Sequence, residues 1–371
     1  MKKHKKYKIP YVNLSKQFQD EKEELLREIE KVLLSGRYIL SEEVEKFEKN
    51  ICKYLNVKYC VGVNSGTDAL ILSLRALNIG VGDEVITQAN SYIATAAAID
   101  AVGAKPVFVD VLDDQTIDSS KLESAINSRT KAIIPVHITG RMCEMDKINI
   151  IAKKYKLKVI EDSAQSFGSK YNNRNSAYYG DCSAFSTHPL KNFNASGDGG
   201  FITTNKKSIF NFVKLKRNHG HIDRNKIKFW GGVSRLDSIQ AVILNCRIKK
   251  IKDVLSKREK NAKLYLKNLD KRFFYHPKYR KNCKDTYHLF VIQVKKRDKL
   301  RKYLFENKIE TNIHYPVPIH KQSFFIKRYK AFRLPNTERQ AKKILSLPIN
   351  QHLKKSEILK ICKFFNNFYK N

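Results

Sequence analysis

From residue 59 onward, short β-branched runs alternate with stretches that have helical spacing of apolar residues. The runs that indicate strands span residues 59–63, 84–87, 106–109, 132–136 and 158–161, with further candidates at 183–186 and 200–203. The intervening helical stretches span residues 68–77, 93–102, 121–126 and 146–155. This alternation predicts an α/β fold with a mostly parallel central sheet and helices on both of its faces.

The pattern changes after Gly231 and Gly232, where apolar spacing predicts one long helix over residues 235–269. Beyond it, residues 288–294 and 308–313 read as strands, and 298–306 and 338–345 as helices. A chain of 371 residues exceeds what one hydrophobic core usually supports. We therefore expect a large domain over residues 1–245, with an N-terminal tail and helix, and a smaller C-terminal α+β domain over 246–371, entered through the long helix.

Charge is the most unusual feature of the composition: 72 Lys and Arg against 36 Asp and Glu give a formal net charge of +36. A nucleic-acid module would concentrate arginines and aromatic residues on one element, whereas these lysines are spread over the whole chain. We therefore expect no nucleic-acid partner. A positive surface does raise the encounter rate with phosphorylated small molecules.

Other global features exclude several classes of protein. The sequence has no run of 18 apolar residues, so no membrane span is expected. Its seven cysteines are scattered and form no CxxC, which fits neither a disulfide framework nor a zinc site and favours the reducing cytoplasm. The start, residues 1–11, resembles the basic region of a secretory signal, but Pro10 and Asn13 follow instead of an apolar segment, so a solvated tail is expected.

The first motif that carries chemistry is residues 63–68, Val-Asn-Ser-Gly-Thr-Asp, where a strand ends and a helix begins. Such a turn presents backbone N–H groups and hydroxyls at the positive end of a helix dipole, which favours a phosphate. Taken alone, the serine is more often simply a helix N-cap.

The second motif is residues 161–165, Glu-Asp-Ser-Ala-Gln, which places Asp162 at the end of an apolar strand. Ligands of parallel sheets bind outside the carboxyl ends of the strands, so Asp162 is expected to face one. The alternative is that Asp162 caps a following helix. A metal role is not expected, because no further ligand lies at suitable spacing.

The third motif is residues 185–192, Phe-Ser-Thr-His-Pro-Leu-Lys-Asn, followed by the glycine turn 197–200. A lysine forms an imine with a carbonyl only when its amine is deprotonated, which burial favours. Lys191 follows Asp162 by 29 residues in the same α/β domain. Together, a phosphate cradle, a strand-end aspartate and such a lysine meet the needs of pyridoxal phosphate (PLP), whose phosphate, pyridine nitrogen and aldehyde carbon they would hold.

With these motifs in place, the sequence resembles the DegT/DnrJ/EryC1/StrS family of PLP-dependent sugar aminotransferases of fold-type I. The similarity also includes residues 9–14 (Ile-Pro-Tyr-Val-Asn-Leu), 41–48, 217–220 (Arg-Asn-His-Gly), 234–241, 313–316 (Ile-His-Tyr-Pro) and 345–349 (Leu-Ser-Leu-Pro-Ile). It therefore covers nearly the whole chain, with the motifs in the family's order.

The resemblance implies roles for individual residues. Lys191 would be the imine-forming, proton-shuttling lysine and Asp162 the partner of the pyridinium nitrogen. Other cofactor contacts would come from Gly66, Thr67 and Ser186 at the phosphate, Gln165 at the ring hydroxyl and Tyr92 stacked on the ring, although Tyr92 read alone fits a core position equally well. Weaker candidates for contacts with the sugar are His188, His219, Tyr315 and His320.

One departure from the family pattern concerns Val233. Many relatives have there an asparagine that reaches the cofactor phosphate of the partner subunit, which a valine side chain cannot do. The resemblance implies a homodimer with active sites at the subunit interface, and Val233 weakens that inference slightly.

The expected activity is PLP-dependent transfer of an amino group from L-glutamate to a nucleotide-linked keto-deoxysugar. A glutamine at position 165 is common in relatives that act at C3, so we expect amination of a dTDP-3-keto-6-deoxyhexose. The alternatives are amination at C4, an inosose (cyclitol) aminotransferase and, from another class, a nucleic-acid-binding or regulatory protein. Related dehydratases carry histidine at the lysine position, and Lys191 argues against that class.

Overall fold

A computed structural model describes residues 7–329 and 331–370, and the lysine-rich start, residues 1–6, lies outside this described part. Seven strands form the main sheet in the order β1 (Tyr59–Val63), β9 (Gly200–Thr204), β8 (Cys182–Ser186), β5 (Lys158–Asp162), β4 (Thr130–Ile133), β2 (Glu84–Gln88) and β3 (Lys105–Val109). Only β9 runs antiparallel to its neighbours within this sheet. The predicted α/β fold with a mostly parallel sheet is therefore confirmed.

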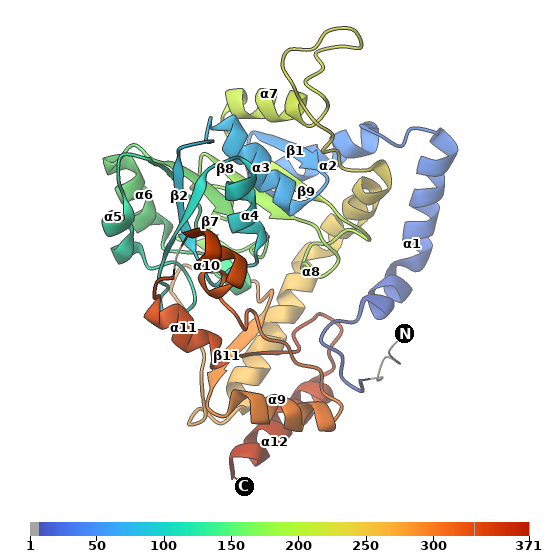
Figure 1. The fold of residues 1–371 in the computed structure, drawn as a ribbon. Coiled ribbons are helices and arrows are strands. Elements are labelled where there is room, and N and C mark those ends of the chain that lie inside the picture. The colour runs from blue at the N-terminus through green and yellow to red at the C-terminus, as the bar shows by residue number, and fades with distance from the viewer. Residues whose placement is uncertain (1–6, 330, 371) are drawn as a thin grey trace.

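Helices cover both faces of this sheet (Figure 1). The α-helices of the described part of the chain, including those of the smaller part, are α1 (Leu14–Ser35), α2 (Glu42–Leu55), α3 (Gly66–Ala76), α4 (Ala94–Ala101), α5 (Leu122–Ala125), α6 (Met145–Lys154), α7 (Lys207–Lys216), α8 (Ser238–Asn268), α9 (Arg297–Glu306), α10 (Ser323–Tyr329), α11 (Pro335–Ala341) and α12 (Lys355–Lys370).

The alternation of side chains along each strand explains this layering. Val61, Ala184 and Ile202 point to one face, where they pack with α3 and α7. Their neighbours Phe185 and Phe201 point to the other face, where they pack with α2 and α8. Because helices cover both faces, these strands carry apolar side chains on both sides.

The long helix α8 joins the main sheet to a smaller group of elements, as Figure 1 shows. Near its start, Ala241 and Leu244 pack with α2. Near its end, Ala262 and Tyr265 share a second core with α9, α12 and a three-stranded sheet. That sheet has the order β10 (Phe274–Tyr275), β11 (Phe290–Val294), β12 (Ile344–Leu347). The proposed division of the chain at residue 245 stays a prediction.

Two expected elements of the small part are wrong. Residues 308–313 form no strand: Ile309 and Asn312 make isolated bridges to Ile9 and Ser346. The reason is that the antiparallel partner of β11 is β12, which occupies the end of the expected helix 338–345. The helix itself begins earlier, at Pro335, a residue suited to a first helical turn, and ends at Ala341.

Three further observations concern the described part of the chain. None of its helices is both long enough and apolar enough to cross a membrane. No group of three or more His, Cys, Asp or Glu side chains within it is arranged to hold a metal ion. All seven cysteines are free thiols.

Candidate active site

A cavity of about 420 Å³ opens at the edge of the main sheet where β5 and β8 end and α3 begins. Because β5 and β8 are parallel, their carboxyl ends meet at this edge. Nine of the eleven residues that the sequence singled out line the cavity: Gly66, Thr67, Tyr92, Asp162, Gln165, Ser186, His188, Lys191 and Tyr315.

The predicted phosphate cradle corresponds to the first turn of α3. Ser65 is the N-cap of this helix, and its hydroxyl accepts a hydrogen bond from Asp68 N (3.1 Å). The interpretation of this serine as a helix cap is therefore also correct. Gly66 has no side chain because the backbone here passes close to β8: an added Cβ would lie 2.6 Å from the Cβ of Ser186. The helix N-terminus and the Ser186 hydroxyl thus lie on the cavity wall together, as an anion site requires.

Asp162 ends β5 and is buried. Its carboxylate accepts hydrogen bonds from Thr95 Oγ1 (2.8 Å) and Ala164 N (3.2 Å). Burial raises its pKa, against the lowering effect of these bonds and of Lys191. The chain after β5 forms turns and no helix, so Asp162 caps none. A buried carboxylate of this kind is stabilised by a cation such as a protonated pyridine ring.

Lys191 lies in the tight turn after β8, where its N–H donates to His188 O (2.8 Å). Burial lowers the pKa of its amine to about 8, with Asp162 acting in the opposite direction. A lysine with a depressed pKa has a useful fraction of free amine near neutral pH, which is the nucleophilic form.

Gln165, Tyr92 and Tyr315 form another part of the wall. Gln165 Oε1 accepts a hydrogen bond from Thr139 N (2.7 Å), which leaves its NH₂ as the group that can donate to a ligand. The rings of Tyr92 and Tyr315 have centroids 6.0 Å apart. Tyr92 is 58% exposed and is therefore not the core tyrosine that was its alternative interpretation.

Two expected substrate residues lie elsewhere. His219 does not line the cavity; it belongs to the loop after α7, where its N–H donates to Gly232 O (2.9 Å). His320 is fully buried beside Glu338 (3.2 Å) and Phe332, so it contributes to packing around α11. The sequence alone could not show that these two histidines lie outside the cavity lining, and the substrate role of His219 stays a prediction.

The cavity also contains residues that the sequence analysis did not single out as site residues: Tyr11, Ser91, Thr95, Arg258, His288, Asn312 and His314. The sequence did contain a feature that could have indicated Arg258. This arginine lies between Leu255 and Ala262 on the buried face of α8, where a charged residue is unusual. Thr95 lies one helical turn after Ser91, to whose hydroxyl it is hydrogen-bonded (2.9 Å).

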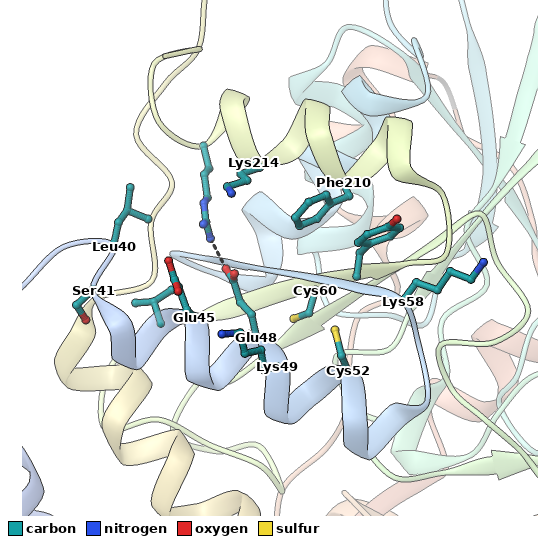
Figure 2. A pocket seen from close by; sticks show the side chains of 13 residues that line it. Leu40, Ser41, Glu45, Glu48, Lys49, Cys52, Lys58, Cys60, Phe210 and Lys214 are labelled. Carbon is teal, nitrogen blue, oxygen red and sulfur yellow. Dashed lines mark hydrogen bonds and ion pairs between the residues drawn. The ribbon is translucent and has the colours of Figure 1, made fainter. Parts of the chain in front are cut away.

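A second hollow, of about 520 Å³, lies between α2, β1 and α7 (Figure 2). It contains none of the predicted site residues. Its main polar contact is the ion pair of Arg217 with Glu48 (2.6 Å), and the same guanidinium donates to Gly62 O (2.7 Å). The family motifs that contain Glu48 and Arg217 therefore tie α2 and α7 to β1, the edge strand.

The cavity residues fit PLP. Its phosphate would lie at the N-terminus of α3, its pyridine nitrogen at Asp162 and its aldehyde carbon at Lys191. When bound, PLP supplies an electron sink that stabilises negative charge on the carbon of an attached amine. The chain supplies the buried amine, the buried carboxylate and the anion site around that group.

Comparisons with known proteins identify the family of this chain. The model of the DegT/DnrJ/EryC1/StrS aminotransferase family matches residues 19–366. A dTDP-3-amino-3,6-dideoxy-alpha-D-galactopyranose transaminase from Aneurinibacillus thermoaerophilus is 40% identical over 97% of this chain and 99% of its own.

Two solved structures are also similar. DesV from S. venezuelae, in complex with a ketimine intermediate, has a TM-score of 0.95 at 35% identity and covers 98% of this chain and 99% of its own. NtdA from Bacillus subtilis, with bound cofactor PMP, has a TM-score of 0.92 at 31% identity, over 100% and 87% of the two chains. This chain belongs to the DegT/DnrJ/EryC1/StrS aminotransferase family.

Proposed function

We propose that this protein uses PLP to transfer an amino group from L-glutamate to C3 of a nucleotide-linked 3-keto-6-deoxyhexose, with dTDP as the nucleotide. The observation that carries the proposal is the meeting of Lys191, Asp162 and the first turn of α3 in one cavity. The sugar class is supported by the 40% identical relative, whose name describes a dTDP-3-amino sugar.

In this proposal each cavity residue has a defined task. The Lys191 amine binds the cofactor and, when free, moves a proton to or from the carbon that carries the amino group. Asp162 holds a proton on the pyridine nitrogen through its negative charge. The first turn of α3 and Ser186 bind the phosphate, and the NH₂ group of Gln165 donates to the ring oxygen without adding charge beside the sugar.

The surface charge suits the proposed substrate. A net charge of +36 attracts a nucleotide diphosphate toward the protein from any direction. This attraction is expected to affect the rate of encounter more than the identity of the sugar, and it weakens with salt.

We further propose a cytoplasmic homodimer. The loop between α7 and α8 projects from the body of the protein at the top of Figure 1. Its apolar side chains are exposed, Trp230 by 88%, together with Ile222, Ile227 and Val233. Such a projecting apolar loop suits contact with a second copy, in which case Val233 contributes packing where relatives have a polar asparagine.

The position of amination can be tested directly. Purified enzyme with L-glutamate is offered the 3-keto and the 4-keto dTDP-6-deoxyhexoses and an inosose, and the new C–N bond is located by NMR. The proposal predicts an amine at C3 of the first substrate. An amine at C4, or reaction with inosose alone, would refute it in favour of one of the two enzymatic alternatives.

A further inference from the structure

Arg258 is the most unusual residue of the cavity that the proposed mechanism leaves without a task. It projects from α8, is only 4% exposed, and lines the cavity. It forms no ion pair with an acidic side chain in the described part of the chain. By contrast, the buried guanidiniums of Arg141, Arg217 and Arg247 each have a carboxylate partner. A buried charge without a counter-charge is costly, so it calls for an anion.

The hydrogen bonds of Arg258 leave one side of its guanidinium free. Nη1 donates to three backbone carbonyls, those of Tyr287 (3.0 Å), His288 (3.4 Å) and Ile349 (2.8 Å). These bonds fix the plane of the group. Nε is buried without a partner among the described residues, as it is in several other arginines of this chain. Nη2 has no hydrogen bond there either and is not among the buried unpartnered atoms, so it is the nitrogen that remains to donate to a ligand in the cavity.

Two neighbours of this guanidinium, Tyr11 and His288, are polar and uncharged. Among the described residues, His288 Nδ1 has no hydrogen-bond partner, and the buried Tyr11 hydroxyl has only Ser346 beside it. Burial, helped by the Lys191 amine, lowers the pKa of His314 to about 4 and that of His288 well below its usual range. Burial lowers the pKa of Arg258 to about 10, so near neutral pH the guanidinium stays charged between neutral neighbours.

Arg258, His288 and His314 line the same cavity as the reacting amine of Lys191, whose charge lowers the pKa of both histidines. A group bound here would be part of the same molecule whose amino group is to be transferred. The site has one fixed positive charge, which matches one carboxylate. A diphosphate carries more negative charge and would be better matched by the lysines of the protein surface.

We propose that Arg258, assisted by the Tyr11 hydroxyl, binds a carboxylate of the amino donor. The inference rests on the proposed function, because it assigns a place to the glutamate of that reaction. It makes Arg258 a binding residue for the donor alone and gives it no contact with the keto-sugar.

The test uses the PLP-loaded enzyme and L-glutamate without any sugar, and follows the loss of yellow colour by stopped-flow absorbance. Arg258→Gln removes the charge at similar volume, and Tyr11→Phe removes only a hydroxyl. We expect the half-saturating L-glutamate concentration to rise about 10- to 100-fold in Arg258→Gln, as for a lost charged hydrogen bond, and about 3- to 10-fold in Tyr11→Phe. Calorimetric binding of glutarate, a dicarboxylate without an amine, should weaken in parallel.

Arg247→Gln is the matched control, because Arg247 is also a buried arginine of α8 that donates to a backbone carbonyl, but it lies outside the cavity lining. Its half-saturating concentration should stay at the wild-type value. If Arg258→Gln and Tyr11→Phe keep both wild-type values while remaining folded, or if Arg258→Gln instead weakens binding of the keto-sugar, the inference is overturned. If the wild-type enzyme itself keeps its colour with L-glutamate, it is the proposed donor that fails.

Discussion

Replacing Asp162 by asparagine separates catalysis from stability more cleanly than any other change in this site. The amide side chain of Asp162→Asn would keep the shape of the carboxylate: its oxygen could accept from Ala164 N, now at 3.2 Å, and its NH₂ could donate to Thr95 Oγ1, now at 2.8 Å. What the variant loses is the negative charge. A charge pair at about 4 Å, with the effective dielectric constant of about 20 that suits proteins, is worth about 4 kcal/mol. If the transition state loses about 4 kcal/mol of stabilisation, turnover slows about a thousandfold.

The same substitution, Asp162→Asn, should not destabilise the cofactor-free protein. Burial raises the pKa of Asp162, so the charged carboxylate is disfavoured in the folded state relative to the unfolded state. This penalty is absent at pH values below the ordinary carboxyl range, and it is present near neutral pH. We therefore expect Asp162→Asn to melt at the same or a higher temperature than the wild type at pH 7, with no difference at acidic pH.

The assay is the single-turnover reaction with L-glutamate, with thermal unfolding of both cofactor-free proteins measured across pH. A variant that keeps its rate within about tenfold of the wild type and melts earlier at pH 7 would refute the reasoning. Asp162 would then be a structural residue of the turn after β5.

Three further changes test other parts of the account. Lys191→Ala should abolish transamination while leaving the fold and the binding of PMP, measured by equilibrium dialysis, in place; measurable turnover would contradict the role of Lys191. Because burial lowers the Lys191 pKa to about 8, the rate at which cofactor-free protein takes up PLP should rise with pH up to about 8 and then level off; a rate that still climbs toward pH 10 would indicate an ordinary lysine. Gly66→Ala places a Cβ 2.6 Å from that of Ser186, so it should cost about 1–3 kcal/mol of stability and weaken PLP binding, whereas Gly80→Ala, whose Cβ meets only an ordinary contact at 3.5 Å, should do neither.

The sequence predicted the main sheet well, because its strands are apolar on both faces and are bounded by clear turns. It predicted the small part less well. The alternation of apolar residues in 308–313 is used for burial of Ile309 and for single bridges, and no strand forms. Residues 344 and 345, which continue a helical pattern, instead begin β12 and pair with β11. Such outcomes depend on which partner is available in three dimensions, which local periodicity does not contain.

The predicted site residues divide in a similar way. Lys191, Asp162 and Gly66 stand at strand or helix ends, where topology brings them to one edge of the sheet. His219 lies in a loop and His320 in the short 3-10 helix Ile319–Lys321, and the sequence does not determine the direction of either segment. Arg258 is far from the motifs along the chain, and its place in the cavity results from the course of α8 between the two cores.

The central claim is that this cavity holds PLP on Lys191 and uses it to move an amino group. Reduction of the purified yellow enzyme with borohydride, followed by peptide mapping, tests it most directly. We expect the reduced cofactor on the peptide that contains Lys191, and we expect prior decolorisation with L-glutamate to prevent the labelling. Label on a different lysine, or labelling that L-glutamate leaves unchanged, would contradict it.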